Sequence, residues 1–155
     1  RPFRMKRASK YFTWRELQCR GSGLVRMPRT TYEENAFWGL LATADEIRQE
    51  FGHPLVCRSG HRSKIHNLKI GGALRSMHLF LAMDLAPRRR DWPGENFDHA
   101  MSELSSIIEE LDLGGVGRYQ NFIHIDQRDF LGRPRSRWED NARWTRYDRY
   151  HPEGP

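Results

Sequence analysis

The sequence has 155 residues, 37% hydrophobic and 30% charged, which is long enough to bury a core and typical of one globular domain. No apolar run approaches the roughly 18 residues of a transmembrane helix, and no secretory signal is recognisable. The formal net charge of +6 suits a nucleic acid, an anionic lipid or an acidic polymer such as a bacterial cell wall. No zinc-finger, RNA-recognition or basic-zipper motif accompanies this charge, so we expect no specific nucleic-acid partner.

The first segments of the chain predict helices. Residues 11–23 indicate a short helix that ends at a glycine, with Thr13 and Glu16 at capping-box spacing. A longer helix is predicted within residues 30–52, because Thr31 and Glu34 repeat that spacing and a glycine closes the segment. Its apolar residues recur at helical spacing: Phe37, Leu40, Leu41, Ala44, Ile47 and Phe51.

The rest of the chain interleaves short strands and helices. Strands are predicted at 54–60, 81–87, 115–120 and 121–128, and helical segments at 63–72 and 96–115. The last two strands are close neighbours and suggest a hairpin-like pair. The predicted fold class is therefore α+β, with a small central antiparallel sheet flanked by helices.

The ends and the cysteines add little to the fold prediction. We expect a single domain over residues 1–155, with a basic arm at about 1–10 and an Arg/Trp-rich tail at about 133–155 that packs along the domain. Cys19 and Cys57 are too far apart for a CxxC metal-binding pair. One disulfide and two buried free thiols both fit the sequence.

Residues of metal-binding type interrupt two apolar segments. His78 and Asp84 flank the run LFLAM, and FIHID places His124 and Asp126 on one face of a strand, with isoleucines on the other. A catalytic zinc site combines three His, Asp, Glu or Cys ligands with an open position for water. Arg62 follows a glycine turn, and its planar guanidinium suits a carboxylate. Each signal alone is better explained by ordinary polar residues at the surface.

In combination, these segments resemble a known family. FTWRELQC, SGHRSKIHNLKIGGALRSMHLFLAMDL and GVGRYQNFIHIDQRDFLGRPRSRW together are similar to the M15 family of zinc peptidases. The similarity is strongest to its D-alanyl-D-alanine carboxypeptidases and cell-wall endopeptidases from bacteria and phages. It extends from about Phe12 to Trp138 and implies the small α+β fold shared with the hedgehog signalling domain.

The resemblance also implies a site and a function. By this resemblance His78, Asp84 and His124 would bind Zn²⁺, Arg62 would hold a substrate carboxylate or carbonyl, and Ser76 would help to bind the substrate. The expected function is a zinc-dependent peptidoglycan hydrolase that cleaves an amide bond in the D-alanine-containing stem or cross-link peptide. We expect a monomer that acts at the bacterial cell wall, and an endolysin of a bacteriophage, a virion-borne enzyme and a bacterial remodelling enzyme all fit.

The spacing of the first two implied ligands departs from the family pattern. The family's SxHxxGxAxD places the aspartate seven residues after the histidine, whereas Asp84 follows His78 by six. If His78 lies in a loop, that loop can absorb the difference. A loss within the strand would instead turn Asp84 to the other face of the sheet.

The general base is a second departure. Many relatives carry Glu, Asp or His two or three residues before the last ligand, where this chain has Phe122 and Asn121. Asp126 is the nearest candidate base, although it could instead orient a metal ligand; His61 is the weaker candidate. Both departures favour an alternative function, a non-catalytic member of the same fold that binds cell wall or a protein partner.

Overall fold

A five-stranded sheet forms the centre of the fold. In the computed structural model, which describes residues 6–148, its strands are β1 (Leu55–Ser59), β2 (Met83–Pro87), β3 (Gly115–Tyr119), β4 (Ile123–Asp126) and β5 (Ser136–Asp140). Their order is β1-β2-β4-β3-β5. Neighbouring strands are antiparallel, except that β3 and β5 run parallel. The predicted α+β class is confirmed, and the parallel pair adds to the antiparallel sheet expected from the sequence.

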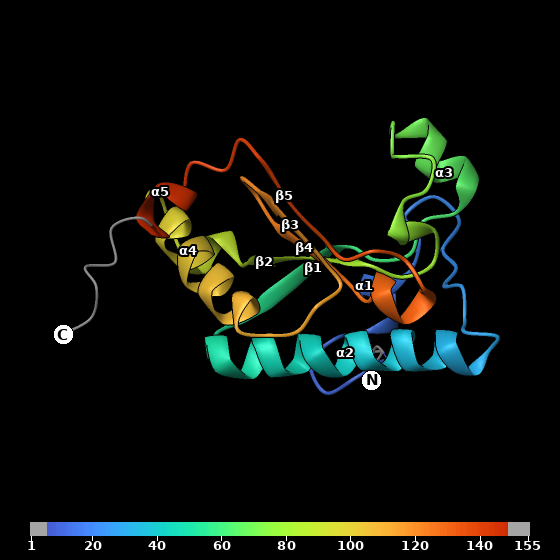
Figure 1. The fold of residues 1–155 in the computed structure, drawn as a ribbon. Coiled ribbons are helices and arrows are strands. Elements are labelled where there is room, and N and C mark those ends of the chain that lie inside the picture. Colours follow the sequence, from blue (N-terminus) through green and yellow to red (C-terminus); the bar gives the residue numbers. More distant parts are fainter. Residues whose placement is uncertain (1–5, 149–155) are drawn as a thin grey trace, which may run out of the picture.

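The two long helices lie against the sheet (Figure 1). The helices are α1 (Trp14–Leu17), α2 (Thr31–Phe51), α3 (Lys64–Lys69), α4 (Asn96–Glu109) and α5 (Thr145–Asp148), with 3-10 turns η1 (Met77–Leu79), η2 (Arg89–Asp91) and η3 (Arg128–Leu131). Helices α2 and α4 lie against the sheet, whereas α3 projects from the opposite side of the molecule (Figure 1). Ile123 and Ile125 of β4 are fully buried in the core, as their alternation predicted. No described helix is long and apolar enough to cross a membrane.

The start of α2 corrects the predicted cap. All six residues of the predicted apolar face are buried, and Gly52 ends the helix in the left-handed conformation with φ 76°. The N-cap, however, is Thr30, whose hydroxyl accepts a hydrogen bond from the amide of Glu33 at 3.1 Å. The pair Thr31 and Glu34 therefore lies one residue too far along the chain. The capping box of Thr13 and Glu16 is confirmed, on a helix of four residues.

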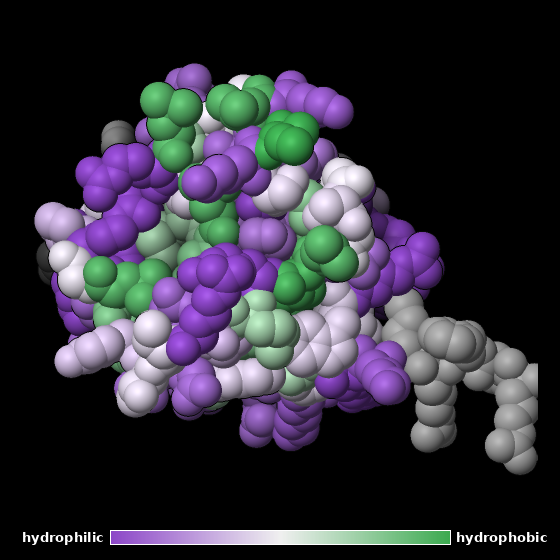
Figure 2. Space-filling view, turned by 90° about the vertical axis from the view of Figure 1, so that its right-hand side faces the viewer, coloured by the Kyte–Doolittle hydropathy of each residue, from purple (hydrophilic) through white to green (hydrophobic). Residues whose placement is uncertain are grey.

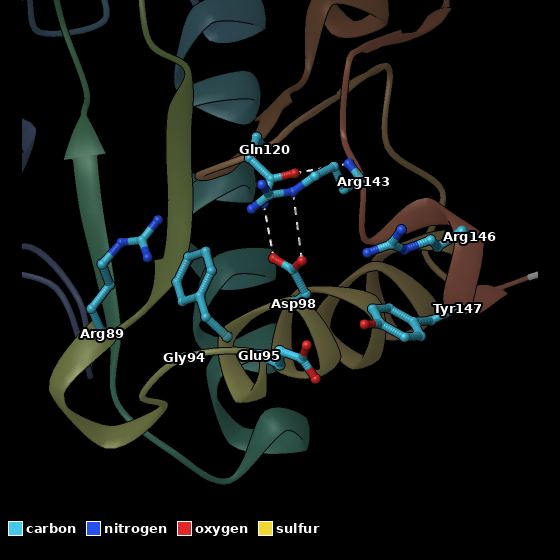
Figure 3. Close-up of a pocket in the computed structure, with 9 residues that line it drawn as sticks. Arg89, Gly94, Glu95, Asp98, Gln120, Arg143, Arg146 and Tyr147 are labelled. Atoms are coloured by element: carbon cyan, nitrogen blue, oxygen red, sulfur yellow. Dashed lines mark hydrogen bonds and ion pairs between the residues drawn. The ribbon is translucent and has the colours of Figure 1, made fainter.

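The tail is part of the folded unit as far as the structure describes it. Strand β5 pairs with β3, and Trp144 is fully buried, with its indole Nε1 donating to the carbonyl of Tyr119 at 2.9 Å. Gln120 links the tail to α4, since its amide donates to Asp98 and its oxygen accepts from the Arg143 backbone, both at 2.8 Å (Figure 3). Residues 1–5 of the predicted arm and 149–155 of the tail lie outside the described residues.

The structure also shows the state of the two cysteines and a group of exposed apolar side chains. Cys19 and Cys57 are both buried free thiols, so the second of the two cysteine alternatives holds. Large apolar side chains are exposed on and after α3: Ile65, Leu68, Ile70 and Leu74. Apolar side chains gather along the upper edge of the face that carries this helix (Figure 2).

Candidate metal centre

One row of residues crosses the sheet and builds most of the site. Strand register aligns Ser59 with Asp84, Asp84 with His124, His124 with Gly117, and Gly117 with Trp138. Because side chains alternate between the two faces of a strand, residues aligned in this way share a face. We call these five residues the site row. The row lies on the sheet face opposite the isoleucines of β4.

His78 joins the row from a loop. It lies in η1, where the hydroxyl of Ser76 accepts a hydrogen bond from the His78 amide at 3.1 Å. The His78 carbonyl accepts from the amide of Arg62 at 2.6 Å, and ring atom Nδ1 faces the carbonyl of Gly60 at 2.6 Å. Since β2 begins at Met83, the missing residue falls in the loop before the strand. The loop absorbs the shorter spacing, and Asp84 stays on the site face.

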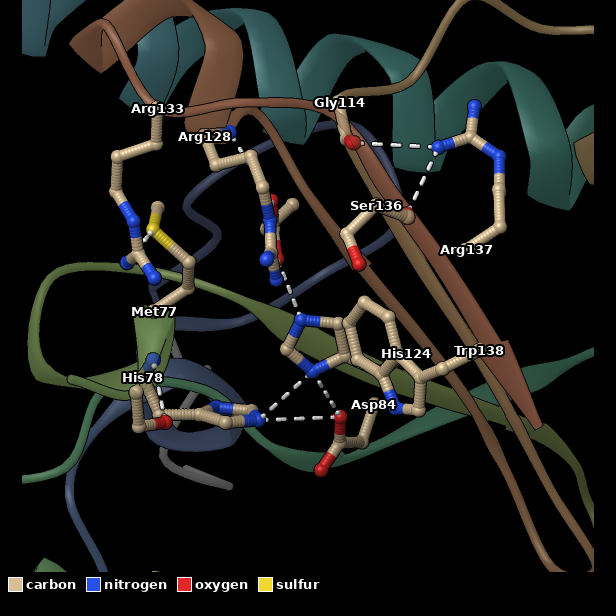
Figure 4. A network of polar contacts seen from close by, with 12 residues as sticks. Met77, His78, Asp84, Gly114, His124, Arg128, Arg133, Ser136, Arg137 and Trp138 are labelled. Carbon is tan, nitrogen blue, oxygen red and sulfur yellow. Dashed lines mark hydrogen bonds and ion pairs between the residues drawn. The ribbon is translucent and has the colours of Figure 1, made fainter. Parts of the chain in front are cut away.

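Three donor atoms meet at this point. His78 Nε2, Asp84 Oδ1 and His124 Nδ1 are mutually separated by 3.2 Å (Figure 4). Tetrahedral zinc with bonds of about 2.0–2.1 Å holds its ligand atoms about 3.3 Å apart. The three separations therefore match a tetrahedral ion with one position left open. All three side chains are buried.

The contacts of the two ring nitrogens that point away from the cluster, His78 Nδ1 and His124 Nε2, show whether a cation would fit between the other two. His78 Nδ1 faces a backbone carbonyl, which only accepts, so this atom carries the proton in the neutral ring and Nε2 carries a lone pair. His124 Nε2 lies 2.6 Å from Asp126 Oδ2, which leaves a lone pair on Nδ1. Two lone pairs and a carboxylate oxygen thus face one another, and this arrangement requires a cation or protons between them. The donor set fits a zinc ion.

Asp126 contacts the Nε2 atom of the His124 ring, on the opposite side of the ring from the Nδ1 atom that belongs to the cluster. Its carboxylate is fully buried and also accepts from Arg128 through Nε at 3.0 Å and Nη2 at 2.7 Å. Burial would raise the pKa of Asp126, but its contacts with His124 and Arg128 outweigh burial and hold that pKa well below the usual range. A buried carboxylate engaged on both oxygens suits orientation of His124 rather than proton transfer in the cleft. The geometry thus favours the orienting alternative over the predicted catalytic role.

Hydrogen bonds within the cluster shift the pKa values of Asp84 and His124 towards their charged forms. Burial alone would raise the pKa of Asp84, but hydrogen bonds to His124 and His78 lower it well below its usual range. Burial would lower the pKa of His124, but hydrogen bonds to Asp126 and Asp84 raise it. His61 lies nearby but is buried, with Nδ1 3.1 Å from the carbonyl of Phe80, and burial lowers its pKa. It is not among the residues that line the cleft described next.

A cleft of about 520 Å³ opens beside the three donors. It is lined by Arg62, Gly71, Gly72, Ala73, Arg75, Ser76, Met77, His78, Asp84, Tyr119, Phe122, His124, Arg128, Arg133, Ser136 and Trp138. Arg62 donates from Nε to Ser59 at 3.2 Å and from Nη1 to Asn67 at 3.4 Å, and its Nη2 lies 3.7 Å from Asp84 Oδ2. The structure therefore places the five residues implied as ligands or substrate contacts around one cleft.

Sequence reasoning missed the residues that make room for this cluster. A Cβ on Gly117 would lie 2.3 Å from the Trp138 ring, and one on Gly115 would lie 2.4 Å from the Asp126 carboxylate. The Trp138 ring packs beside His124, with ring centroids 5.1 Å apart, and its Nε1 donates to the Tyr119 hydroxyl at 2.8 Å. The available signal was GVG itself, because two glycines at alternate strand positions clear one face.

Comparison with known proteins agrees with this geometry. A family model described as Peptidase M15 matches residues 10–126. The chain belongs to the Peptidase M15 family. Members of this family are metallo-enzymes, and among residues 6–148 the cluster of His78, Asp84 and His124 is the group that could hold the metal. A search of curated proteins finds no match.

Family membership carries the class of activity to this chain. An M15 peptidase hydrolyses an amide bond in a peptide, so the cleft beside the three donors is the candidate active site. The matched segment, 10–126, ends at Asp126, and the cleft-lining residues Arg128, Arg133, Ser136 and Trp138 follow it. These residues come from η3, β5 and the segment between them, which distinguishes this part of the cleft from the matched core.

Proposed function

We propose that this M15 peptidase is a zinc-dependent peptidoglycan hydrolase that cleaves an amide bond in the D-alanine-containing stem or cross-link peptide. The observation that carries the proposal is the equal 3.2 Å spacing of three donor atoms from His78, Asp84 and His124. Such spacing suits zinc, and the three residues that would hold it line an open cleft. The substrate class rests on the resemblance to cell-wall peptidases.

In this proposal the residues in and around the cleft have different roles in amide hydrolysis. A zinc ion held by His78, Asp84 and His124 would acidify a water molecule and polarise a carbonyl group. Asp126 holds the His124 ring through Nε2 and thereby keeps Nδ1 aimed at the cluster. The Arg62 guanidinium, fixed by Ser59 and Asn67, supplies positive charge where the scissile carbonyl oxygen becomes negative.

The cleft also offers polar groups that a bound substrate could reach. Among the described residues that line the cleft, Asp84 is the one carboxylate, and it belongs to the donor cluster. Tyr119 lines the same cleft and accepts a hydrogen bond from Trp138 Nε1, which leaves its own hydroxyl proton to donate. We assign Tyr119 the role of hydrogen-bond donor to the substrate in the proposed reaction.

The site of action follows from charge and substrate. A formal net charge of +6 draws the protein towards anionic polymers, and a bacterial wall is such a polymer. We propose that the protein acts on the wall as a monomer, as a phage lysin, a virion-borne enzyme or a bacterial remodelling enzyme. Release of a terminal residue and cleavage within a cross-link are both open to a cleft of this size.

Digestion of purified muropeptides tests the proposal. The zinc-loaded protein should convert stem or cross-linked peptides to products that mass spectrometry identifies, either free D-alanine or separated stems. A chelator and His78→Ala should each abolish the conversion, and restored zinc should rescue only the chelated wild type. A zinc-loaded wild type that leaves every muropeptide intact would contradict the proposal.

The lack of a second carboxylate in the described cleft favours one alternative. A non-catalytic member of the family would bind wall peptides at the same cleft and turn none of them over. Equilibrium binding of a muropeptide to the zinc-loaded protein, without products after prolonged incubation, would identify this alternative.

A further inference from the structure

The cleft carries an unusual concentration of arginine. Four arginines line it, and among its described lining residues Asp84 is the sole acid. Two of the four already have acidic neighbours: Arg128 binds Asp126, and Arg62 lies 3.7 Å from Asp84. Arg75 and Arg133 form no ion pair with any residue of the described range 6–148.

Arg133 is held in place by the backbone. Gly132 adopts the left-handed conformation with φ 76° after η3, and the amide of Arg133 donates to the carbonyl of Arg128 at 3.0 Å. The guanidinium of Arg133 donates from Nη1 to the backbone carbonyl of Arg75 at 3.0 Å and lies 2.9 Å from Met77 Sδ. These contacts fix the side chain (Figure 4) and involve no carboxylate, so Arg133 has no ion-pair partner among the described residues.

The surroundings of Arg133 disfavour its positive charge. Partial burial, together with the like charges of Arg128 and Arg75, lowers the pKa of Arg133. The cavity beside α4 has a different balance of charge. It is lined by three arginines and two acids, Glu95 and Asp98, and there Arg143 lies 3.9 Å from Asp98 (Figure 3). In the cleft, by contrast, Arg75 and Arg133 have no acidic partner among the described residues, so an anion could bind to them.

We propose that Arg75 and Arg133 form a carboxylate-binding subsite of the cleft, separate from Arg62. The inference rests on the proposed function, because the carboxylate would belong to the peptide that is cleaved. Both residues line the cleft, and the Arg133 guanidinium lies beside Met77 and the Arg75 backbone carbonyl. Guanidinium forks bind carboxylates through paired, charge-assisted hydrogen bonds.

The subsite would make the enzyme selective for acidic peptides. A wall peptide offers two sources of this group: the carboxylate at its C-terminus and carboxylates within the stem. Amidation removes the charge at either place with little change in size. Loss of one charge-assisted contact should weaken binding about 10- to 100-fold, so amidation at the recognised position should raise KM by that factor.

A matched set of peptides and variants tests the subsite. The substrates are one muropeptide, the same peptide amidated at its C-terminus, and the same peptide amidated at its internal carboxylates. The variants are Arg133→Met, Arg75→Met and, as a control with the same change of charge, Arg90→Met, whose side chain is exposed on η2 outside the cleft. Calorimetry of each peptide with each variant runs beside steady-state kinetics.

We expect the wild type and Arg90→Met to prefer one acidic position by about 10- to 100-fold in KM and Kd, with kcat little changed. Arg133→Met should bind acidic and amidated peptides alike. Arg133 also contacts Met77, so its replacement could disturb local packing. Arg75 is exposed, and Arg75→Met therefore tests the loss of an arginine from the subsite without that complication. Equal affinity of the wild type for all three peptides would overturn the subsite.

The failure of the subsite and the failure of the proposed function give different results. If no peptide is cleaved, the hydrolase proposal fails, but calorimetry still decides whether an acidic position is recognised. If all three peptides are cleaved with the same KM and bound with the same Kd, the hydrolase stands and the subsite falls.

Discussion

His78 and Asp84 are six residues apart in sequence, and His78 Nε2 lies 3.2 Å from Asp84 Oδ1. The turn η1 and the loop that follows it, which ends where β2 begins at Met83, bring the His78 side chain next to Asp84 of β2. Register then places Asp84 directly opposite His124 on the neighbouring strand. The spacing between the first two donors is therefore set by a loop, whereas the spacing between the second and third is set by the sheet.

Asp126→Asn should separate orientation of His124 from general-base catalysis. The amide keeps the shape of the carboxylate but loses the charge that holds the Nε2 proton of His124. We expect zinc affinity to fall about 10- to 100-fold, as for other groups that orient metal ligands, with activity recovered at saturating zinc. Competition with a chromophoric chelator measures the affinity, and Asp112→Asn, on an exposed carboxylate, is the control. Unchanged zinc affinity with activity lost at every zinc concentration would assign Asp126 as the base instead.

Protonation of Asp126 should destabilise the metal-free protein in acid. The pKa of Asp126 is depressed in the folded chain, so its contribution is fully present above the unfolded pKa of about 3.9 and is lost as pH falls through the folded pKa. Wild type should exceed Asp126→Asn in free energy of unfolding at pH 7, and the difference should shrink below about pH 4. Urea unfolding of both metal-free proteins at several pH values measures this. A difference that stays constant from pH 7 to pH 3 would rule out the carboxylate as its cause.

Gly117→Ala should disturb the site row. The new Cβ would lie 2.3 Å from the Trp138 ring, so either that ring or β3 must move, at a cost of about 1–3 kcal/mol. Gly39→Ala is the matched control, because Gly39 lies inside α2 and its Cβ would meet nothing closer than 3.7 Å. That change should stabilise the protein by about 0.5–1 kcal/mol. Urea unfolding that shows the same effect for both alanines would refute the close packing of Trp138.

Thr30→Ala and Thr31→Ala should differ in stability. Thr30 caps α2 through the amide of Glu33, and loss of such a cap costs about 1 kcal/mol. Thr31 is the first residue of the helix and is exposed, so its replacement should change the free energy of unfolding little. Thermal or urea unfolding of the two variants side by side decides which threonine is the cap. A larger loss for Thr31→Ala would restore the cap predicted from sequence.

Local patterns predicted the parts of the fold that local interactions determine. The apolar spacing from Phe37 to Phe51 found α2, and the alternation around Ile123 and Ile125 found the core face of β4. The cap of α2 was misplaced because Thr30 and Thr31 are adjacent and both have a glutamate three residues on. Only backbone geometry distinguishes the N-cap from the first helical residue.

Long-range pairing placed the rest of the site, and it has no local signature. The parallel alignment of β5 with β3 brings Trp138 over Gly117, although SRWED lacks the alternating apolar residues of a half-buried strand. The role of Asp126 depends on which ring nitrogen of His124 faces it. That choice follows from strand register and side-chain rotamer, which neither motif nor spacing specifies.

Zinc content measures the central claim most directly. Wild-type protein, loaded with zinc and dialysed, should retain about one ion per chain by elemental analysis, because three donors 3.2 Å apart form a tetrahedral site. Asp84→Ala should retain much less under the same dialysis, since it removes one of the three donors. A wild-type chain that retains no zinc, or an Asp84→Ala chain that retains as much as the wild type, would contradict the proposed metal centre.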